Sequence, residues 1–427
     1  MLCLDVVQII CDFSDLRTQI NLISSCQEYY EYLKIRKLNC FDGIGSNITQ
    51  EVITQRKFDR LQKLDARDNN KITNVNHLQN TLIELDCCSY RGDDYCGIDQ
   101  KGISNLKILR KLNASNNNKI TNLNHLRNTL TELNCWNDCG IDQKGISELK
   151  ALQKLCVSNN WKITDLNHLL NTLIELDCGG YYCGINQKGI YNLKILRKLN
   201  AGNNSKITDV NHLQNTLTEL YCHCDCGIDQ KGISELTKLQ KLHAAGNTKI
   251  RDVNHLENTL TELDCKWCWI DQKGISKLKV LRKLDARNND KITNVNHLQN
   301  TLIELDCSEL CRIDQKGISN LKVLQKLNAS GNSRIRDVNH LQNTLTELKC
   351  AEICGINQQG ISNLTKLQKL HANSNNKIKN VNHLQNTLIE LECCKNCGID
   401  QKGIKNLKVL QKLVAHRNKK ITSFDHN

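Results

Sequence analysis

One motif returns about every 43 residues along the chain, and this repetition limits the possible folds more than any other feature of the sequence. Its first copy, KITNVNHLQNTLIELDC, begins at Lys71. Further copies begin at Lys119, Lys162, Lys206, Lys249, Lys291, Arg334 and Lys377, and a shortened copy begins at Lys420. A fixed period of this size predicts a solenoid, in which each unit buries its apolar face against its neighbours.

Each unit divides into two half-repeats. The first reads L-x-x-L-x-A-x-x-N-x-x-I and occurs nine times, and the second reads L-x-x-L-x-C, a variable loop and C-x-I and occurs eight times. Strand alternation sends the side chains at positions 4 and 6 inward and those at positions 3 and 5 onto an exposed concave face. Asparagine stands at position 9 of the first half-repeat, where its amide can satisfy buried backbone groups. These residues are Asn69, Asn117, Asn160, Asn204, Asn247, Asn289, Asn332, Asn375 and Asn418.

The second half-repeat continues into IDQKGISNLK or a close copy, which predicts a short helix on the convex side. Asp99, Asp142, Asp229 and Asp400 stand where a helix N-cap belongs, and Asn186 replaces aspartate once. A glycine at one register of this segment indicates that the helix packs tightly. The alternation of strand and helix predicts an α/β solenoid with a curved parallel sheet inside and short helices and turns outside.

These half-repeats resemble those of leucine-rich repeat proteins, and the second resembles their cysteine-containing subtype, in which the cysteine leads into a segment similar to IDQKGI. The resemblance covers residues 53–423, and we predict a solenoid of about 17 half-repeats over residues 53–427. The subtype is typical of receptor subunits of ubiquitin ligases. The resemblance therefore directs attention to the residues that precede the repeats.

Residues 1–38 do not repeat, and they resemble an F-box, a helical module that binds the Skp-type adaptor of a cullin ligase. The apolar register that carries the resemblance predicts the adaptor-binding side chains Leu4, Val7, Ile10, Phe13, Leu22 and Tyr30. The Leu-Pro pair that is usual in that family is missing, because the chain has no proline. The alternative is a helical cap over the open end of the solenoid. Residues 39–52 are assigned to a linker or cap.

The pairing of an F-box-like start with such repeats also resembles proteins of giant viruses of amoebae. The expected compartment is the cytoplasm or nucleus, of the host cell if the protein is viral. No stretch approaches the ~20 apolar residues of a membrane span, so no membrane partner is expected. The start of the chain carries Asp5 within its apolar run and lacks a basic segment, which is unlike a signal peptide.

The 24 cysteines are predicted to be reduced thiols. Eight of them stand at position 6 of the second half-repeats, two strands apart, which is about 10 Å at ~4.8 Å per strand. A disulfide needs Cα atoms within roughly 7 Å, so this ladder cannot cross-link itself and is expected to fill the core. A local bond such as Cys135 to Cys139 stays open. The ladder comprises Cys87, Cys135, Cys178, Cys222, Cys265, Cys307, Cys350 and Cys393.

No metal, cofactor or catalytic site is expected. Zinc needs four converging ligands, yet in the CHCDC run strand alternation sends Cys222 inward and His223 outward. The histidines that recur once per unit, from His77 to His383, lie too far apart to share a metal and are assigned to convex turns. Neither a phosphate-binding glycine loop nor a nucleophile motif is present, so the chain is expected not to be an enzyme.

The concave face is predicted to alternate in charge. Position 3 is lysine in every first half-repeat and glutamate in every second one, as in Lys63 and Glu84, so neighbouring strands place opposite charges side by side. The formal net charge of +13 then lies on turns and on the convex side. Because this charge is dispersed and not interleaved with aromatic residues, nucleic acid is not an expected partner.

Aromatic residues in the loops after the second strands are the candidates for binding a partner. These candidates, together with one neighbouring histidine, are Tyr90, Tyr95, Trp136, Tyr181, Tyr182, Tyr221, His223 and Trp267. Beyond residue 269 the sequence contains neither tryptophan nor tyrosine. Drift among duplicated units is the alternative explanation. The target is therefore expected on the N-terminal half of the solenoid, whereas the late loops, which hold Glu309, Glu352 and Lys395, are expected to contribute little.

We expect a protein that binds other proteins. The predicted function is that of a substrate-receptor subunit of an SCF-type ubiquitin ligase. In this role the N-terminal segment binds the adaptor and the repeats bind a protein target. The alternative is a leucine-rich repeat scaffold whose N-terminus only caps the solenoid.

Overall fold

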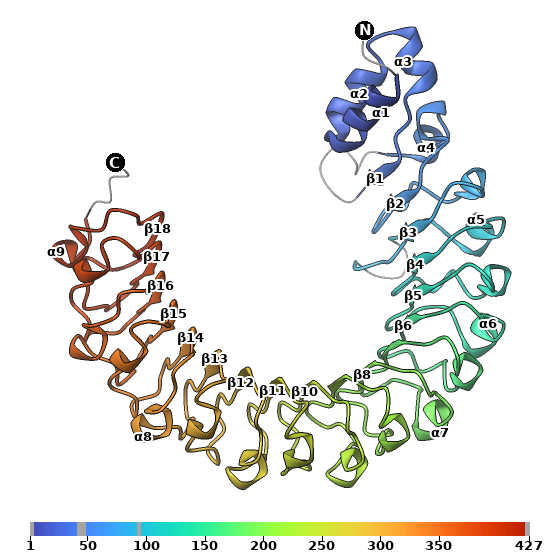
Figure 1. Ribbon diagram of the computed structural model, residues 1–427. Helices are drawn as coiled ribbons and strands as arrows, with labels where there is room; N and C mark the ends of the chain where they lie inside the picture. Colours follow the sequence, from blue (N-terminus) through green and yellow to red (C-terminus); the bar gives the residue numbers. More distant parts are fainter. Residues whose placement is uncertain (1–3, 41–47, 92–94, 423–427) are drawn as a thin grey trace. The chain divides into compact units, whose positions relative to one another are not determined.

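The computed structural model describes residues 4–40, 48–91 and 95–422. The chain forms two compact units, residues 1–207 and 208–427, and each is considered by itself. In both units short parallel strands alternate with helical turns, and Figure 1 shows the strands along one side of the coil and the helical turns along the other. This arrangement confirms the predicted α/β solenoid.

Three helices open the first unit: α1 (Leu4–Phe13), α2 (Leu16–Ile23) and α3 (Gln27–Tyr32). Helix α2 begins after Asp15, whose carboxylate accepts a hydrogen bond from the Thr18 amide at 2.9 Å. An N-cap of this kind satisfies one of the amides that the first helical turn leaves unpaired. The F-box-like segment of the sequence is therefore helical.

Eight strands of the first unit pair in sequence order, each parallel to the next. They are β1 (Lys37–Asn39), β2 (Lys63–Asp65), β3 (Glu84–Asp86), β4 (Lys111–Asn113), β5 (Glu132–Asn134), β6 (Lys154–Cys156), β7 (Glu175–Asp177) and β8 (Lys198–Asn200). The helical turns between them are α4 (Gln50–Ile53), η2 (Arg56–Phe58), η3 (Asn76–Leu78), α5 (Gln100–Ile103), η4 (Asn124–Leu126), α6 (Gln143–Ile146), η5 (Asn167–Leu169) and α7 (Gln187–Ile190).

Ten strands of the second unit continue the same pattern. They are β9 (Glu219–Tyr221), β10 (Lys241–His243), β11 (Glu262–Asp264), β12 (Lys283–Asp285), β13 (Glu304–Asp306), β14 (Lys326–Asn328), β15 (Glu347–Lys349), β16 (Lys369–His371), β17 (Glu390–Glu392) and β18 (Lys412–Val414). The helical turns are η6 (Asn211–Leu213), η7 (Lys231–Ile233), η8 (Asn254–Leu256), η9 (Lys273–Ile275), η10 (Asn296–Leu298), α8 (Gln315–Ile318), η11 (Asn339–Leu341), η12 (Gln359–Ile361), η13 (Asn382–Leu384) and α9 (Gln401–Ile404).

Strands β2 to β18 correspond to the seventeen half-repeats, and β1 adds a further strand, whose half-repeat has Ile35 where the others have leucine. Lys37 of β1 pairs with Lys63 of β2, so the repeat architecture already begins before residue 39. The segment assigned to a linker or cap, residues 39–52, contains the end of β1 and the start of α4, and residues 41–47 lie outside the described part of the chain.

The core is built as the alternation predicts. In strand β4, Lys111 is exposed, Leu112 is buried and Asn113 is half-buried. In the glutamate strands, such as β5, the central leucine is buried between two half-buried residues. Leucine at position 4 and alanine or cysteine at position 6 fill the interior, as in Leu133 and Cys135. Burying one leucine side chain contributes about 1.5–3 kcal/mol, and each unit repeats this contribution strand after strand.

The asparagine ladder satisfies the backbone where each strand ends. Asn117 is buried, and its Nδ2 donates to the carbonyl oxygens of Cys87 and Ile98, both at 3.1 Å. Its Oδ1 accepts from the Lys119 amide at 3.0 Å. This confirms the role predicted for position 9.

The helical turns pack as closely as the glycine register predicts. The Asp99 carboxylate accepts from the Gly102 amide at 2.8 Å, which confirms the predicted N-cap. A Cβ atom on Gly102 would lie 2.1 Å from the carbonyl oxygen of Thr73 in the neighbouring turn. Only glycine fits at this position, because any side chain would collide with backbone.

Candidate interaction surfaces

One side of α1 carries an apolar stripe that is open to solvent. The stripe consists of Val6, Ile9, Ile10 and Phe13. Residues spaced by three, four and seven positions lie on one face of a helix. The Phe13 side chain is 90% exposed, so this face is not covered by any other described part of the chain. An exposed apolar patch on a soluble domain is typical of an interaction site.

The predicted adaptor-binding residues divide into two groups. Ile10, Phe13 and Tyr30 are exposed, and Leu4 and Leu22 are half-exposed. Val7 is 4% exposed and packs inward, so its side chain is not available to a partner. Val6 and Ile9, which the predicted set left out, take its place on the surface.

A buried amide fixes the orientation of α1. Gln8 Nε2 donates to the carbonyl oxygen of Lys34 at 2.9 Å, and the Lys34 amide donates to Gln8 Oε1 at 2.8 Å. The Lys34 ammonium in turn lies 3.4 Å from Asp59 Oδ2 in the first repeat. These contacts hold the Gln8 side of α1 against the chain that enters β1, and the apolar stripe consequently faces solvent.

The exposed face of the sheet, formed by the first and third residues of the strands, carries the predicted row of alternating charges. Lys63 Nζ lies 2.7 Å from Glu84 Oε1, and the same separation is 2.8 Å for Lys154 and Glu175. Each exposed pair contributes about 0.2–1 kcal/mol. The row therefore contributes little to the stability of the fold. Its main effect is to set the alternating order of positive and negative charges along this face.

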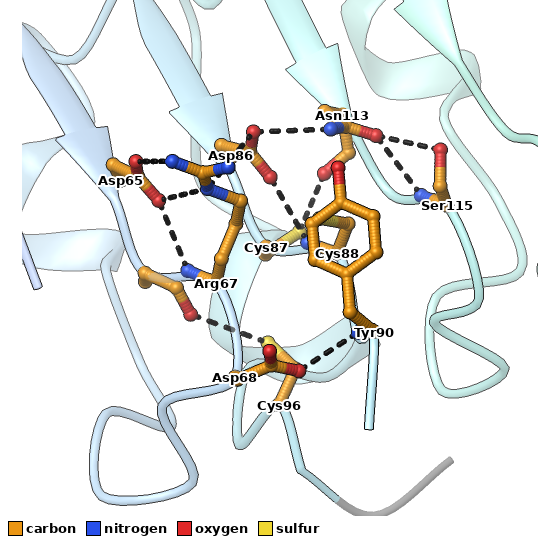
Figure 2. A network of polar contacts seen from close by, with 11 residues as sticks. Asp65, Arg67, Asp68, Asp86, Cys87, Cys88, Tyr90, Cys96, Asn113 and Ser115 are labelled. Atoms are coloured by element: carbon orange, nitrogen blue, oxygen red, sulfur yellow. Dashed lines mark hydrogen bonds and ion pairs between the residues drawn. The ribbon is translucent and has the colours of Figure 1, made fainter. Parts of the chain in front are cut away.

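A second row, at the third strand residue, contains an acidic cluster in the first unit (Figure 2). Arg67 Nε donates to Asp65 Oδ1 at 2.8 Å and its Nη2 donates to Asp65 Oδ2 at 2.6 Å. Arg67 Nε also lies 3.8 Å from Asp86 Oδ2, which accepts from Asn113 Nδ2 at 3.0 Å. Burial raises the pKa of Asp86. Arg67 thus occupies a site between two carboxylates on neighbouring strands.

The adjoining loop holds an aromatic side chain beside this cluster. The Tyr90 amide donates to Asp68 Oδ1 at 2.8 Å, and Figure 2 shows the Tyr90 ring next to Cys88. Asp68 has a φ of 50°, the left-handed conformation that aspartate tolerates better than most residues. The loop backbone is therefore anchored, while the Tyr90 ring stays exposed.

The second unit repeats this cluster because it repeats the sequence. Residues 283–307 read KLDARNNDKITNVNHLQNTLIELDC, and residues 63–87 differ from them only in the order of one Asn-Asn-Asp triplet. Arg287 Nη2 lies 3.2 Å from Asp306 Oδ2 and 3.7 Å from Asp285 Oδ2. Burial raises the pKa of Asp285. With Asp264 on β11, three consecutive strands present a row of aspartates.

The predicted aromatic candidates lie at the loops as expected, but they are not equally accessible. Tyr90, Tyr95, Tyr181, Tyr182 and Trp267 are exposed, whereas Trp136, Tyr221 and His223 are half-buried. The ring of Tyr221 stacks on His243 with centroids 4.2 Å apart, and its hydroxyl donates to Glu219 Oε1 at 2.7 Å. Tyr221 is thus held on the sheet and does not project from a loop.

Two exposed aliphatic residues in the loops are not among the predicted binding residues. Leu310 is 74% exposed and Ile353 is 79% exposed, and each stands immediately before the second cysteine of its unit. The only available signal was an apolar residue in a loop where other units have Asp138, Asp225 or Asn396. The late loops therefore also present apolar surface. The difference in partner binding that the sequence predicts between the early and the late loops is correspondingly smaller. Other exposed aromatic residues outside the predicted set are Trp161, Tyr191 and Trp269.

Each half-repeat turns through position 8, one residue before the asparagine position, and several such residues have positive φ. In the second unit this conformation falls on Cys224 (54°), Trp267 (58°), Asn288 (55°), Glu309 (61°), Glu352 (64°), Ser374 (60°), Lys395 (58°) and Arg417 (59°), and on Gly246 and Gly331. Bulky side chains seldom adopt it, at a cost of roughly 1–2 kcal/mol each. Because the same conformation recurs at position 8 in nearly every half-repeat, it belongs to the turn of the solenoid and does not distinguish particular loops.

All 23 cysteines in the described part of the chain are free thiols. Cys135 and Cys139 are not joined by a disulfide. The hydrogen bond that the Cys135 thiol donates to Cys139, together with burial, raises the pKa of Cys135. The position-6 cysteines are buried, which confirms that they fill the core. In the same described residues, one group could hold a metal ion: His371, Glu390 and Glu392. Glu390 already lies 2.5 Å from Lys412 Nζ and 3.8 Å from Lys369 Nζ, so lysines occupy this position.

None of the helices described is both long and apolar enough to cross a membrane.

No protein-family model matches the chain, and no curated protein matches it. Among solved structures, the leucine-rich repeat protein LIC12759 of Leptospira interrogans is 23% identical, with a TM-score of 0.52 over 94% of this chain and 98% of that one. The functional domain of InlJ from Listeria monocytogenes, which includes a cysteine ladder, is 27% identical, with a TM-score of 0.49 over 71% of this chain and 66% of that one. The chain thus spans just under two thirds of the InlJ domain. The fold is a leucine-rich repeat solenoid.

Proposed function

We propose that this chain is a binding protein without catalytic activity of its own, which joins an adaptor at α1 to a protein target at its repeats. The observation that carries the proposal is the exposed apolar stripe of α1, formed by Val6, Ile9, Ile10 and Phe13. The leucine-rich repeat fold favours protein–protein interaction, because it presents one long row of side chains on a rigid support.

The proposed adaptor is the Skp-type subunit of a cullin ubiquitin ligase. Three short helices occupy the segment that resembles an F-box, and one of them offers an apolar face with the large side chain of Phe13 at its end. A partner that covers this face would remove the stripe from water, which is the main source of affinity at such interfaces. The ligase would then ubiquitinate whatever the repeats hold.

A scaffold in which the N-terminal helices only cap the solenoid is the second candidate. It explains why Val7 and Cys11 are buried against the rest of the chain. It gives no role to the four exposed apolar residues on the opposite side of α1. A cap needs a polar outer face, and this outer face is apolar.

The test is co-elution of the purified chain with a purified Skp-type adaptor. An amoebal adaptor is the first choice, because the repeats and the N-terminal segment resemble proteins of giant viruses of amoebae. We expect a stable complex with the unaltered chain and its loss in Ile10→Asp, since a carboxylate in an apolar interface is left without a partner. Val409→Asp, at an exposed position near β18, is the matched control and should bind as the unaltered chain does.

Absence of a complex with the unaltered chain would remove the ligase role and favour the scaffold. A complex that Ile10→Asp leaves intact would place the adaptor elsewhere on the chain.

A further inference from the structure

We propose that Cys265 and Cys268, in the loop that follows β11, form a peroxide-sensitive thiol pair, which closes to a disulfide more readily than the other cysteine pairs of the repeats. This site goes beyond the proposed binding function and does not depend on it, because it involves neither α1 nor a protein target. It assigns a redox modification to two thiols of the second unit.

The spacing of this pair is the shortest that the second half-repeats contain. Two residues separate the position-6 cysteine, Cys265, from the cysteine of the C-x-I segment, Cys268, whereas at least three separate the corresponding cysteines of the other units. The Cys268 amide donates to the Cys265 carbonyl oxygen at 3.4 Å, so the two cysteines are the first and fourth residues of a turn. The Cα atoms of such residues lie within about 7 Å of each other. A disulfide requires Cα atoms within this range.

The next unit shows how a longer spacing changes the geometry. There the Cys311 amide donates to the Ser308 carbonyl oxygen at 3.4 Å, so the turn that ends at Cys311 begins at Ser308. Cys307 therefore lies before this turn, whereas Cys265 is the first residue of the turn in its own unit. The geometry favours a disulfide in the Cys265 unit, and the Cys307 unit provides a natural comparison.

Hydrogen-bond donors converge on the sulfur of Cys268. The Ile270 amide donates to Sγ at 3.4 Å, and Nδ2 of the buried Asn289 donates to it at 3.7 Å. The Cys265 thiol also donates to Cys268, and this bond, together with burial, raises the pKa of Cys265. Donors of this kind stabilise a thiolate, which is the reactive form of cysteine. Cys268 is thus the thiol that reacts first, and Cys265 stays protonated beside it.

Exposure also distinguishes Cys268 from equivalent thiols. Its side chain is 4% exposed, whereas Cys139 and Cys397, at the same position of other units, are 0% exposed. Both neighbours of Cys268 in the chain, Trp267 and Trp269, are exposed. The Cys268 sulfur therefore lies just below the surface of a loop, where a molecule as small as a peroxide reaches it after a small movement.

The reaction consumes one peroxide molecule for each pair. The Cys268 thiolate attacks the peroxide, the O–O bond breaks and Cys268 becomes a sulfenic acid, while the departing hydroxide takes up the proton that Cys268 lost and gives the first water. The Cys265 sulfur then attacks the sulfenic sulfur, the S–O bond breaks, and the second water leaves with the Cys265 proton. The two thiols lose two electrons and the peroxide gains them. A dithiol reductant reverses the modification by thiol–disulfide exchange.

The test exposes the reduced full chain to hydrogen peroxide, blocks the remaining thiols in denaturant and maps disulfides by mass spectrometry. Trypsin cleaves after Lys266 and so places the two cysteines on different peptides, residues 252–266 and residues 267–273. The disulfide joins these two peptides. We expect the joined pair to form about tenfold faster than a Cys307–Cys311 disulfide and to disappear after treatment with a dithiol reductant.

Three variants assign the roles of the thiols. Cys268→Ser should remove the joined pair, and Cys265→Ser should let a sulfenic acid accumulate on Cys268, where dimedone traps it. Cys311→Ser is the matched control, because it removes the cysteine at the same position of the next unit, and it should leave the Cys265–Cys268 disulfide unchanged.

Two results with the unaltered chain would overturn the inference, whatever the variants do. One is that the Cys265–Cys268 disulfide forms no faster than the Cys307–Cys311 disulfide. The other is that it forms only after the chain has been unfolded in urea, because the proposal requires the folded turn to bring the two thiols together.

Discussion

Gln8 and Lys34 are joined by two hydrogen bonds that connect a buried side-chain amide to the backbone 26 residues away. The pair determines which side of α1 faces the repeats and which side faces solvent. The proposed adaptor site depends on this orientation, because Ile10 and Phe13 lie on the side away from Gln8.

Replacing Gln8 with leucine should loosen the helical segment from the first repeat. The change leaves the Lys34 amide and carbonyl without their partner, and an unsatisfied buried backbone group costs about 1–3 kcal/mol. We expect faster hydrogen exchange in residues 4–33 and unchanged exchange in the second unit. Gln27→Leu is the control, because the exposed Gln27 side chain donates to Glu31 Oε1 within α3 at 2.7 Å. Equal effects of the two variants would show that the bonds of Gln8 to Lys34 do not hold the segment.

Replacing Asn247 with alanine should destabilise the solenoid. Asn247 is fully buried, its Nδ2 donates to the carbonyl oxygens of Cys222 (2.9 Å) and Ile228 (3.1 Å), and its Oδ1 accepts from the Lys249 amide (2.9 Å). Losing these partners should lower the free energy of unfolding by roughly 2–4 kcal/mol, as measured by urea denaturation. Asn376→Ala, at an exposed position, should change it little. A small effect at Asn247 would mean that water replaces the amide.

Replacing Glu352 with asparagine should stabilise the protein. Glu352 has a φ of 64°, which asparagine tolerates better, so the free energy of unfolding should rise by about 1 kcal/mol. The control is Lys405→Asn, at an exposed position with a φ of −53°. If both substitutions act alike, backbone strain at Glu352 is not the cause.

Acid should destabilise the repeats through their histidines. Burial lowers the pKa of His340, whose Nε2 lies 3.1 Å from the Ile318 carbonyl oxygen, and it does the same at seven other histidines. Those seven are His77, His125, His168, His243, His255, His297 and His383. The unfolded chain takes up protons near the ordinary histidine pKa of about 6.5, before the folded chain does. Stability is therefore complete above about pH 6.5 and falls as the pH decreases below it.

The measurement is the midpoint of urea unfolding at a series of pH values from about 7.5 to about 5.5, and we expect this midpoint to fall as the pH falls. The raised pKa values of Asp86 and Asp285 act in the opposite direction, but there are two of them against eight histidines. His340→Gln keeps a donor for the Ile318 carbonyl and does not titrate, so its midpoint should depend less on pH. An unchanged slope in this variant would show that His340 does not contribute.

The repeat pattern predicted most of the fold, because each element has a local cause in the sequence. Leu112, Asn117 and Asp99 each perform the role that their position predicts. Strand β1 was missed because its half-repeat begins with isoleucine in place of leucine. Ile35, Leu38 and Cys40 stand at positions 1, 4 and 6 of the motif, and all three are buried.

The candidate sites were less predictable because they depend on which way a side chain points. The apolar pattern of α1 could not separate buried Val7 from exposed Val6 and Ile9, since the rotation of the helix is set by the bond from Gln8 to a distant backbone. Leu310 and Ile353 lie in loops, where no periodicity assigns a direction. In such places packing partners determine exposure, and a single sequence does not name them.

Calorimetric titration of the chain with a purified Skp-type adaptor tests the central claim most directly. We expect a one-to-one complex with a negative heat-capacity change, because binding buries the apolar stripe of α1. Phe13→Ala, which removes a side chain that is 90% exposed in the free chain, should leave the fold intact and weaken binding by about 1–4 kcal/mol. A titration without heat at several temperatures, or equal affinity in Phe13→Ala, would contradict the assignment of α1 as the adaptor site.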